Sequence, residues 1–344
     1  MHQVTTPGVL TVVVTHAAPR TLPLVLTTLT AQCPASATAV LYTGPPTGPS
    51  ADRATGACHH TGTTLLTVGA SVRIGTARAW LLDHLARSGA RWTHVAFLDD
   101  DCPPNPGWWK AAQRSTGAAL TFGPRYPAAV HGAGARVRAW EAGHSAKIRG
   151  ARDHRRPVED PPMMVAGGNM IVEVATAHHL GVTDAAFADG AFEDVDYQLR
   201  LRAHGATVTF DPDLAVNHHD QLSATALLRK SVMSGTGLAQ CVQRHGPRLW
   251  QCSRWQPGPV LARTLRQTAP GADCPLPPSL RVLAAARATV VLAAYTTTRL
   301  RQILPLRPHR SRPDTPQVGC CRSSGSKLRL APLSPSQQTC RVEW

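Results

Sequence analysis

No Cys-x-x-Cys pair occurs in this chain, although the sequence has nine cysteines. Zinc ribbons and thioredoxin-type redox sites both use closely spaced cysteine pairs, so this absence argues against either kind of site. Cysteines scattered in this way are typical of the reduced thiols of a cytosolic protein.

Signals for secretion and membrane insertion are also missing. Residues 1–8 lack the basic segment and apolar core of a signal peptide, and no uninterrupted run of about 18 apolar residues occurs. We therefore expect a cytoplasmic location. Residues 282–296, with Arg281 and Arg299 nearby, predict a helix that either packs on its own domain or lies on an acidic membrane surface.

Acidic residues are few, with 21 Asp and Glu against 36 Lys and Arg. Most of the positive excess lies in residues 251–344, which hold 14 Lys and Arg and only 3 Asp and Glu, so residues 1–250 are close to neutral. Aromatic residues make up only 5% of the chain, and the basic region lacks the aromatic platform that single-stranded nucleic acids need. We therefore expect no nucleic-acid partner, but peripheral membrane contact through the basic C-terminal region.

The pattern along the chain predicts three zones. Strand-like and helix-like stretches alternate from Val9 to Asp101, which is typical of a βαβ sheet. We expect an α/β domain over residues 1–250, a helical extension over 251–306, and a basic, disordered tail over 307–344, where apolar residues are too few for a core.

Between Val9 and Asp101, hydrophobic periodicity predicts individual helices and strands. Thr21 suits the N-cap of a helix whose apolar residues fall at i, i+3, i+4 and i+7. A second helix is expected at 74–85, with Ile74, Ala77, Leu81 and Leu85 on one face. The expected strands are Val9–Thr15, Thr38–Tyr42, Leu65–Val68 and His94–Leu98.

Three adjacent carboxylates follow the last of these strands, where Val-Ala-Phe-Leu runs directly into Asp99, Asp100 and Asp101. Packing does not explain them, because neighbouring negative charges repel one another and resist desolvation. A divalent metal with oxygen ligands is the simplest partner, at the sheet edge where α/β proteins bind ligands. An acidic turn that caps the next helix is the alternative.

Two later segments also carry polar signals. Gly167 and Gly168 either let the backbone approach a ligand or form a turn or bulge. A helix is predicted from Phe192, with Glu193 and Asp194 in a first turn where the helix dipole favours carboxylates, which is also an ordinary way to start a helix. Its other signals are a face shared by Phe192, Val195 and Leu199, an ion pair from Asp196 to Arg200, and an αL glycine at Gly205.

His218 and His219 follow a predicted strand at Thr207–Phe210 and a turn. Adjacent residues of an extended chain point to opposite sides, so at most one of the two can be a ligand. The alternative is that both are solvated.

Taken in order, these segments resemble the family 2 glycosyltransferases of the GT-A fold. The resemblance rests on Arg-Ile-Gly-Thr-Ala-Arg, Phe-Leu-Asp-Asp-Asp, Gly-Gly-Asn-Met, Phe-Glu-Asp-Val-Asp and Val-x-His, and it spans residues 9 to about 245. The stretch Leu227–Gly246 is similar to the mycofactocin-type branch. The resemblance implies a Rossmann-like mixed sheet flanked by helices and a metal-dependent, inverting transfer of a hexose from a nucleotide-diphosphate sugar.

The resemblance also implies roles for particular residues. Asp99 and Asp101 would form an Asp-x-Asp motif that holds Mg²⁺ or Mn²⁺ on the diphosphate, and His218 would complete the metal shell. Asp194, beside Glu193, would be the general base that deprotonates an acceptor hydroxyl on a small molecule, lipid-linked glycan or peptide. The implied donor-binding residues are Thr15, His16, Gly75, Arg78, Asp99, Asp100, Gly168 and Asn169.

One departure from the family leaves the nucleotide undetermined. Family members commonly end the second strand on an acidic stretch that recognises the base, whereas this one ends Tyr42-Thr43-Gly44. Main-chain groups, or Thr15 and His16, are candidates to replace that contact. The alternatives to a glycosyltransferase are a sugar nucleotidyltransferase of the same fold and an inactive module that binds nucleotide sugars.

Overall fold

The computed structural model describes residues 8–68, 72–140, 156–157, 167–182, 187, 191–246 and 276–304. In these residues the main sheet is built from β1 (Gly8–Thr15), β2 (Thr38–Tyr42), β3 (Thr64–Thr67), β4 (Trp92–Asp99), β5 (Leu120–Phe122), β7 (Arg156–Pro157), β8 (Asn169–Glu173) and β9 (Val208–Phe210). Its strand order is β3-β2-β1-β4-β8-β5-β9-β7. A second, two-stranded sheet pairs β6 (Arg125–His131) with β10 (Val216–Gln221).

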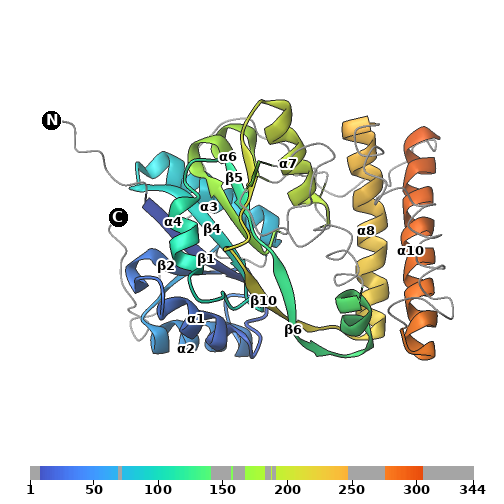
Figure 1. Cartoon of the computed structure of the whole chain (residues 1–344), viewed down its shortest axis with the longest axis horizontal. Helices are drawn as coiled ribbons and strands as arrows, with labels where there is room; N and C mark the ends of the chain where they lie inside the picture. Colours follow the sequence, from blue (N-terminus) through green and yellow to red (C-terminus); the bar gives the residue numbers. More distant parts are fainter. Residues whose placement is uncertain are drawn as a thin grey trace, which may run out of the picture.

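The helices cover the sheet and extend beyond it (Figure 1). They are α1 (Leu22–Thr30), the short 3₁₀ helix η1 (Ala35–Ala37), α2 (Pro49–Thr61), α3 (Ile74–Ser88), α4 (Trp108–Arg114), α6 (Val174–Leu180), α7 (Glu193–Ala203), α8 (Ala224–His245) and α10 (Pro278–Ile303). Contacts join α1 to α2 and α3 to α6. The predicted mixed α/β sheet flanked by helices is confirmed.

Strands β3, β2, β1 and β4 are parallel, and their carboxyl ends meet at one edge of the sheet. The register pairs Thr15 with Tyr42 and Val14 with Asp99, so the first loop and the carboxylates are neighbours. All of β2 and nearly all of β1 are buried, because helices cover both faces of a parallel sheet of this kind. The runs of β-branched and apolar residues in these strands are the sequence signal of that burial.

β8 runs antiparallel to β4 and brings a distant segment to the same edge. Leu98 pairs with Asn169, and the backbone N–H of Asp99 donates to the carbonyl of Gly168 at 3.1 Å. The Gly-Gly segment and the carboxylates, about 70 residues apart in sequence, are therefore adjacent in space.

Local expectations for the first helices are partly corrected. The apolar face of α1 is buried as predicted, but Thr21 makes no side-chain cap bond and donates instead to the carbonyl of Asp100 at 2.9 Å. Ile74 is 36% exposed and does not share the buried face of α3. The turn-rich sequence after β2 gave no helix signal, yet α2 begins at Pro49 and ends at Gly62 in the left-handed conformation.

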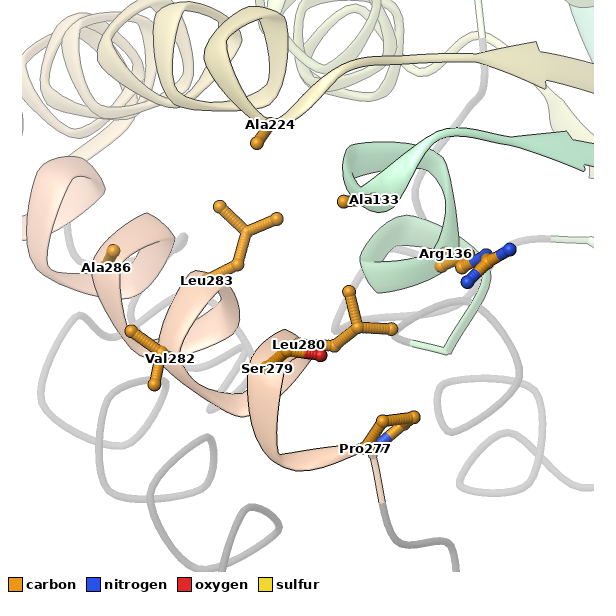
Figure 2. Close-up of a pocket in the computed structure, with 9 residues that line it drawn as sticks. All are labelled: Ala133, Arg136, Ala224, Pro277, Ser279, Leu280, Val282, Leu283 and Ala286. Carbon is orange, nitrogen blue, oxygen red and sulfur yellow. The ribbon is translucent and has the colours of Figure 1, made fainter.

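A second body of helices lies beyond the main sheet, where β6 and β10 extend to a helical segment at 133–140 and to α8 (Figure 1). α10 stands alongside α8, and the two helices approach closely at Gly235. A Cβ on Gly235 would lie 2.4 Å from the carbonyl oxygen of Val291, so only glycine allows this contact. A mainly apolar pocket of about 460 Å³ lies between the segment 133–140 and the N-terminal parts of α8 and α10. Figure 2 shows the residues that line it.

α10 falls within the predicted helical extension. Although it is interrupted by arginines, α10 is the one helix among the described residues that is long and apolar enough, by length and composition, to cross a membrane. Only 11% of the relevant window is buried inside the protein. The predicted domain boundaries remain predictions, and residues 307–344 lie outside the described part of the chain.

Candidate functional site

The carboxylate of Asp100 faces the first loop. It accepts a hydrogen bond from the hydroxyl of Thr15, which also accepts one from the backbone N–H of Ala18 at 3.0 Å. Burial raises the pKa of Asp100 to about 7. The hydrogen bond from Thr15 lowers this pKa, and the negative charges of Asp101 and Asp99 raise it further. Asp100 therefore ties the carboxylate turn to the end of β1.

Asp101 lies with Cys102 and His218 in a group whose potential ligand atoms are all within 4.8 Å of one another. Nε2 of His218 is 3.3 Å from one oxygen of Asp101, and Sγ of Cys102 is 3.2 Å from the other. Burial would raise the pKa of Asp101, but the bond and charge of His218, together with the charge of Arg125, lower it to about 2.

The carboxylate of Asp101 is an oxygen ligand of the kind that Mn²⁺ and Mg²⁺ prefer, and the imidazole of His218 suits Mn²⁺ better than the harder Mg²⁺. Burial strongly raises the pKa of the Cys102 thiol. Sulfur is a softer donor than either ion prefers, so Cys102 is the weakest of the three candidate ligands. Two of the three predicted metal ligands, Asp101 and His218, are thus brought together.

Asp99, the third predicted metal ligand, is not part of that group. Its Oδ1 lies 3.0 Å from Nη2 of Arg78, and its Oδ2 lies 3.7 Å from Nη1 of Arg125. Burial alone would lower the pKa of Arg125, but the negative groups around it, Asp99 and Asp101 among them, raise it. Two arginines therefore balance the negative charge of Asp99.

The two glycines bring carboxylates together, a role that the sequence did not indicate. A Cβ on Gly168 would lie 1.9 Å from Oδ2 of Asp99, so any other residue would displace that carboxylate. The backbone N–H of Gly167 donates to Oδ2 of Asp194 at 2.9 Å. Asp99 and Asp194 thus both contact one short backbone segment.

Glu193 and Asp194 both lie in the first turn of α7, as predicted. Its Oδ1 accepts a hydrogen bond from the N–H of Val195 at 2.8 Å. Burial raises the pKa of Asp194 more than the amide bonds from Gly167 and Val195 and the charge of Arg78 lower it. Burial and the charge of Asp194 also raise the pKa of Glu193. A raised pKa brings a carboxylate closer to the proton affinity that a general base needs near neutral pH.

The backbone that presents Asp194 is conformationally unusual. Phe192, the N-cap of α7, has φ of +70°, a left-handed value rare for a residue with a bulky side chain. A Cβ on Gly237 of α8 would lie 2.4 Å from the carbonyl oxygen of Ala191, so a glycine lets α8 support this turn. Among the described non-glycine residues, only Ala18 shares a positive φ, and it lies beside Thr15 at the other end of the site.

Asp196 is completely buried and ties α7 to α8. Its Oδ2 lies 2.8 Å from Nε of Arg200, which is the predicted ion pair. Its Oδ1 lies 3.0 Å from Nη1 of Arg244 and 2.9 Å from Nε2 of His245, both on α8. Burial alone would raise the pKa of Asp196, but the hydrogen bonds from His245, Arg200 and Arg244 hold it below its usual range.

Asp196→Asn is expected to lower the free energy of unfolding at neutral pH by about 3 to 5 kcal/mol, as breaking a buried charge network typically does. Because the folded-state pKa is depressed, the contribution is complete above the unfolded-state pKa of about 3.9 and is lost as the pH falls through the folded-state value. Urea unfolding of the wild type and Asp196→Asn in progressively more acidic buffers should show the difference between their unfolding free energies shrinking. Asp83→Asn is the control, because it removes only solvent-accessible pairs, with Arg87 and with His178, each worth at most about 1 kcal/mol. Equal losses in both variants would contradict the prediction.

The other predicted donor-binding residues occupy different environments. Arg78 is 3% exposed, and its guanidinium carbon lies 5.4 Å from the centre of the Phe97 ring. Gly75 lies in the first turn of α3 and is partly exposed. His16 is exposed, and its Nδ1 lies 3.2 Å from the carbonyl oxygen of Thr43. Thr43 directly follows β2, where the sequence departs from the family pattern. Thr15 is fully buried and already bonded, so it offers little to a nucleotide base.

Asn169 requires a correction. Its side chain is buried, with Nδ2 donating to the carbonyls of Leu214 and Pro124 and Oδ1 accepting from the indole of Trp108. Both amide hydrogens are used within the protein, so the side chain fastens strand β8 rather than facing a donor. An asparagine after two glycines looks the same in sequence in either role.

Arg125, Arg244 and His245 were missed by the sequence reasoning. Arg125 stands in a Gly-Pro-Arg-Tyr stretch without periodicity, and Arg244 and His245 end a helix where basic residues are common. Their roles arise from contacts across elements, and local pattern carries no signal of those contacts.

No protein-family model and no curated protein matches this sequence. The structure is similar to the mannosyltransferase PcManGT from Pyrobaculum calidifontis in complex with GDP-Man and Mn²⁺, with a TM-score of 0.55, 14% identity, and coverage of 86% of this chain and 88% of that one. It is also similar to GalNAc-T7 with UDP, GalNAc and Mn²⁺, with a TM-score of 0.50 and 12% identity, covering 88% of this chain and 58% of that one. The chain therefore has the GT-A fold, as predicted.

Proposed function

We propose that this protein is a metal-dependent glycosyltransferase that moves a sugar from a nucleotide-diphosphate donor to an acceptor hydroxyl. The observation that carries the proposal is the convergence of two acidic groups at one sheet edge. Asp101 and His218 offer metal ligands, while Asp194, with a raised pKa, is bound by the backbone of Gly167 in the segment that also contacts Asp99. Sugar transfer by a single displacement needs one carboxylate on the side of the leaving group and a second on the side of the acceptor.

Departure of a nucleoside diphosphate builds negative charge. Cations at the carboxylate edge, the edge of the sheet that carries Asp99, Asp100 and Asp101, would offset that charge. Mg²⁺ or Mn²⁺ held by Asp101 and His218 would neutralise the diphosphate without moving a proton. Arg78 and Arg125 already flank Asp99 and add fixed positive charge close to the same place. Asp99 would then orient these arginines.

Asp194 would take the proton from the acceptor hydroxyl, with Glu193 modulating its proton affinity. The amides of Gly167 and Val195 hold the carboxylate in one orientation, so its remaining lone pairs point in a fixed direction. A base on the side opposite the leaving group would invert the anomeric carbon. Asp196 is excluded from this role because it is fully buried and faces α8.

Three finer features of the proposal rest on the motif resemblance: membership of family 2, similarity to the mycofactocin-type branch, and hexosyl transfer. A cytoplasmic location and the lack of a nucleic-acid partner are further proposals, which rest on the missing targeting signals, the scattered cysteines and the confinement of basic residues to a region poor in aromatic residues. The Mn²⁺ and nucleotides in the two similar structures favour the same cofactor class and donor class here. The acceptor would be a hydroxyl compound.

A thermal-shift panel tests the proposal directly. Nucleoside diphosphates of each base are expected to raise the melting temperature only with Mn²⁺ or Mg²⁺, and one base should do so at the lowest concentration. A ligand at 100 times its Kd stabilises a protein by about 2.7 kcal/mol, which is readily detected. Stabilisation that is unchanged by EDTA, or absent for every base, would overturn the proposal. Nucleoside triphosphates paired with sugar phosphates form the parallel arm for the nucleotidyltransferase alternative.

We also propose that α10 gives the protein a peripheral contact with anionic membranes. The helix has no acidic residue but four arginines, and Val282, Leu300 and Ile303 are 73%, 51% and 64% exposed. Co-sedimentation should show binding to phosphatidylglycerol vesicles that salt weakens, and little binding to phosphatidylcholine. Leu300→Glu with Ile303→Glu should abolish it, whereas Thr289→Glu with Thr296→Glu, which adds the same charge at exposed polar positions, should weaken it less. Equal binding to both lipids would contradict the proposal.

A further inference from the structure

Arg78 on α3 is a buried cation at the candidate site. Its side chain is 4% exposed, and Nη2 lies 3.0 Å from Oδ1 of Asp99. Its guanidinium carbon lies 5.4 Å from the centre of the Phe97 ring in β4. The side chain of Asp99 is 28% exposed. Asp99 is thus open to a donor, whereas Arg78 is almost closed off from solvent.

The guanidinium of Arg78 is not fully satisfied by hydrogen bonds. Among the described residues, its Nε is buried and has no hydrogen-bond partner. Burying a cation is costly unless its hydrogen bonds are made, and packing alone would favour an apolar side chain. The other residues on the buried face of α3 include Ala77, Leu81 and Leu82. A buried arginine at this position therefore needs a reason other than packing.

Gly167 brings Arg78 next to Asp194. A Cβ on Gly167 would lie 3.2 Å from Nη1 of Arg78 and 3.4 Å from Oδ2 of Asp194. One point in space thus touches the guanidinium and the carboxylate, and the glycine has no side chain to separate them. The backbone N–H of Gly167 donates to the same Oδ2 at 2.9 Å. Arg78 therefore pairs with Asp99 through one nitrogen, while another stands beside Asp194.

The charge of Arg78 acts on both carboxylates of the first turn of α7. Burial raises the pKa of Asp194, whereas two backbone hydrogen bonds and then the charge of Arg78 lower it. Burial and the charge of Asp194 raise the pKa of Glu193, and the charge of Arg78 lowers that pKa too. The closeness of Arg78 and Asp194 at Gly167 is the structural reason for this effect.

Other charged or titratable groups around Asp194 do not replace Arg78. Among the described residues they are Glu193 on its own helix, Arg125 on β6, Cys241 on α8 and, at the next glycine of the same segment, Asp99 on β4. Glu193 and Asp99 are acids, and burial strongly raises the pKa of Cys241, which keeps its thiol neutral. Arg125 lies 3.7 Å from Asp99, beyond hydrogen-bond distance.

We propose that Arg78 is the positioning residue of the acceptor side: it holds Asp194 as a carboxylate ready to accept a proton, and it does not bind the donor. This inference rests on the proposed function and names the residue on which the base depends. The ion pair with Asp99 fixes the guanidinium, so that its second nitrogen stays beside Asp194. Without this cation Asp194 would be protonated over a wider pH range, and a protonated carboxyl cannot take a proton from an acceptor hydroxyl.

Arg78→Gln tests the proposal through the pH dependence of transfer. The rate rises with pH as Asp194 loses its proton, and removal of the cation raises the pKa of Asp194, so this rise should move to higher pH. Transfer should be about tenfold slower below neutral pH and should recover at alkaline pH. Release of nucleoside diphosphate, with the acceptor or with water in its place, measures the rate. Calorimetry with Mn²⁺ and the nucleoside diphosphate should give the wild-type affinity.

Two variants of the same contact accompany this experiment. Arg78→Lys keeps a cation that can pair with Asp99, so it should retain most of the wild-type pH profile. Gly167→Ala removes no charge, but its Cβ would lie between Nη1 of Arg78 and Oδ2 of Asp194, so it should move the profile in the same direction by less. Gly167→Ala also carries the test if Arg78→Gln does not fold. Arg87→Gln is the matched control, because Arg87 is an exposed arginine of the same helix.

NMR of protein labelled with ¹³C at the aspartate carboxyls follows Asp194 without donor or acceptor, and Asp194→Asn assigns its signal. The titration midpoint should move to higher pH in Arg78→Gln and Gly167→Ala but not in Arg87→Gln. An unmoved midpoint in the folded variants would overturn the proposal. Loss of donor affinity with an unmoved pH profile would also overturn it and make Arg78 a donor ligand. A moved midpoint in a protein whose wild type neither binds nucleotides with Mn²⁺ nor transfers sugar would contradict the proposed function instead.

Discussion

Asp194→Asn is expected to slow sugar transfer by about 10²- to 10⁴-fold, the usual range for loss of a general base, while metal-dependent donor binding survives. The reason is that an amide has no proton affinity in the useful pH range, although it has nearly the same shape. Release of nucleoside diphosphate, with the acceptor or with water in its place, measures the rate. Calorimetry with Mn²⁺ and the nucleoside diphosphate measures donor binding separately.

The structure adds a requirement to this experiment. Both oxygens of Asp194 accept backbone hydrogen bonds, from Gly167 and from Val195, and an amide nitrogen cannot replace either acceptor. One N–H is left unpaired in the variant, which costs about 1 to 3 kcal/mol of stability, so melting temperature must be recorded alongside the rate. Glu193→Gln is the matched control and should reduce the rate less. Near-normal turnover by Asp194→Asn would assign the base to Glu193.

Asp101→Asn is expected to remove the metal dependence of nucleotide binding. Loss of an outer-shell partner typically costs about 10- to 100-fold in metal affinity, and loss of a direct ligand should exceed that. Asn keeps the size of the side chain and one oxygen beside His218, so the effect would come from the lost negative charge. Calorimetric titration of nucleoside diphosphate with Mn²⁺ and with EDTA should give the same weak affinity in this variant.

Asp213→Asn is the control for Asp101→Asn, because Asp213 is an exposed acid that pairs with Arg114 at 2.6 Å and is not one of the proposed metal ligands. The wild type and this control should both lose affinity on addition of EDTA. If Asp101→Asn retained full Mn²⁺-dependent binding while folded, the metal would have to be held elsewhere, and Asp99→Asn would be tested next.

Sequence reasoning was most successful where the signal is local. The apolar runs of β1, β2 and β4, the buried face of α1 and the ion pair from Asp196 to Arg200 depend on spacing within one element, so they could be predicted. Expectations were wrong where a neighbour decided the outcome. Thr21 bonds to Asp100 instead of its own helix, and Ile74 is exposed instead of sharing the buried face of α3.

The candidate site divides in the same way. The sequence by itself determined that three carboxylates end a buried strand, that Asp194 lies in the first turn of a helix, and that at most one of His218 and His219 faces inward, since the strand period and helix geometry set these positions. Only the tertiary structure decided which groups meet. In the structure, Asp99 pairs with Arg78 and Arg125 and lies outside the group of Asp101 and His218. The side chain of Asn169 is buried and bonded within the protein. Long-range strand pairing and helix packing create these contacts between residues far apart in the chain, and no local pattern records them.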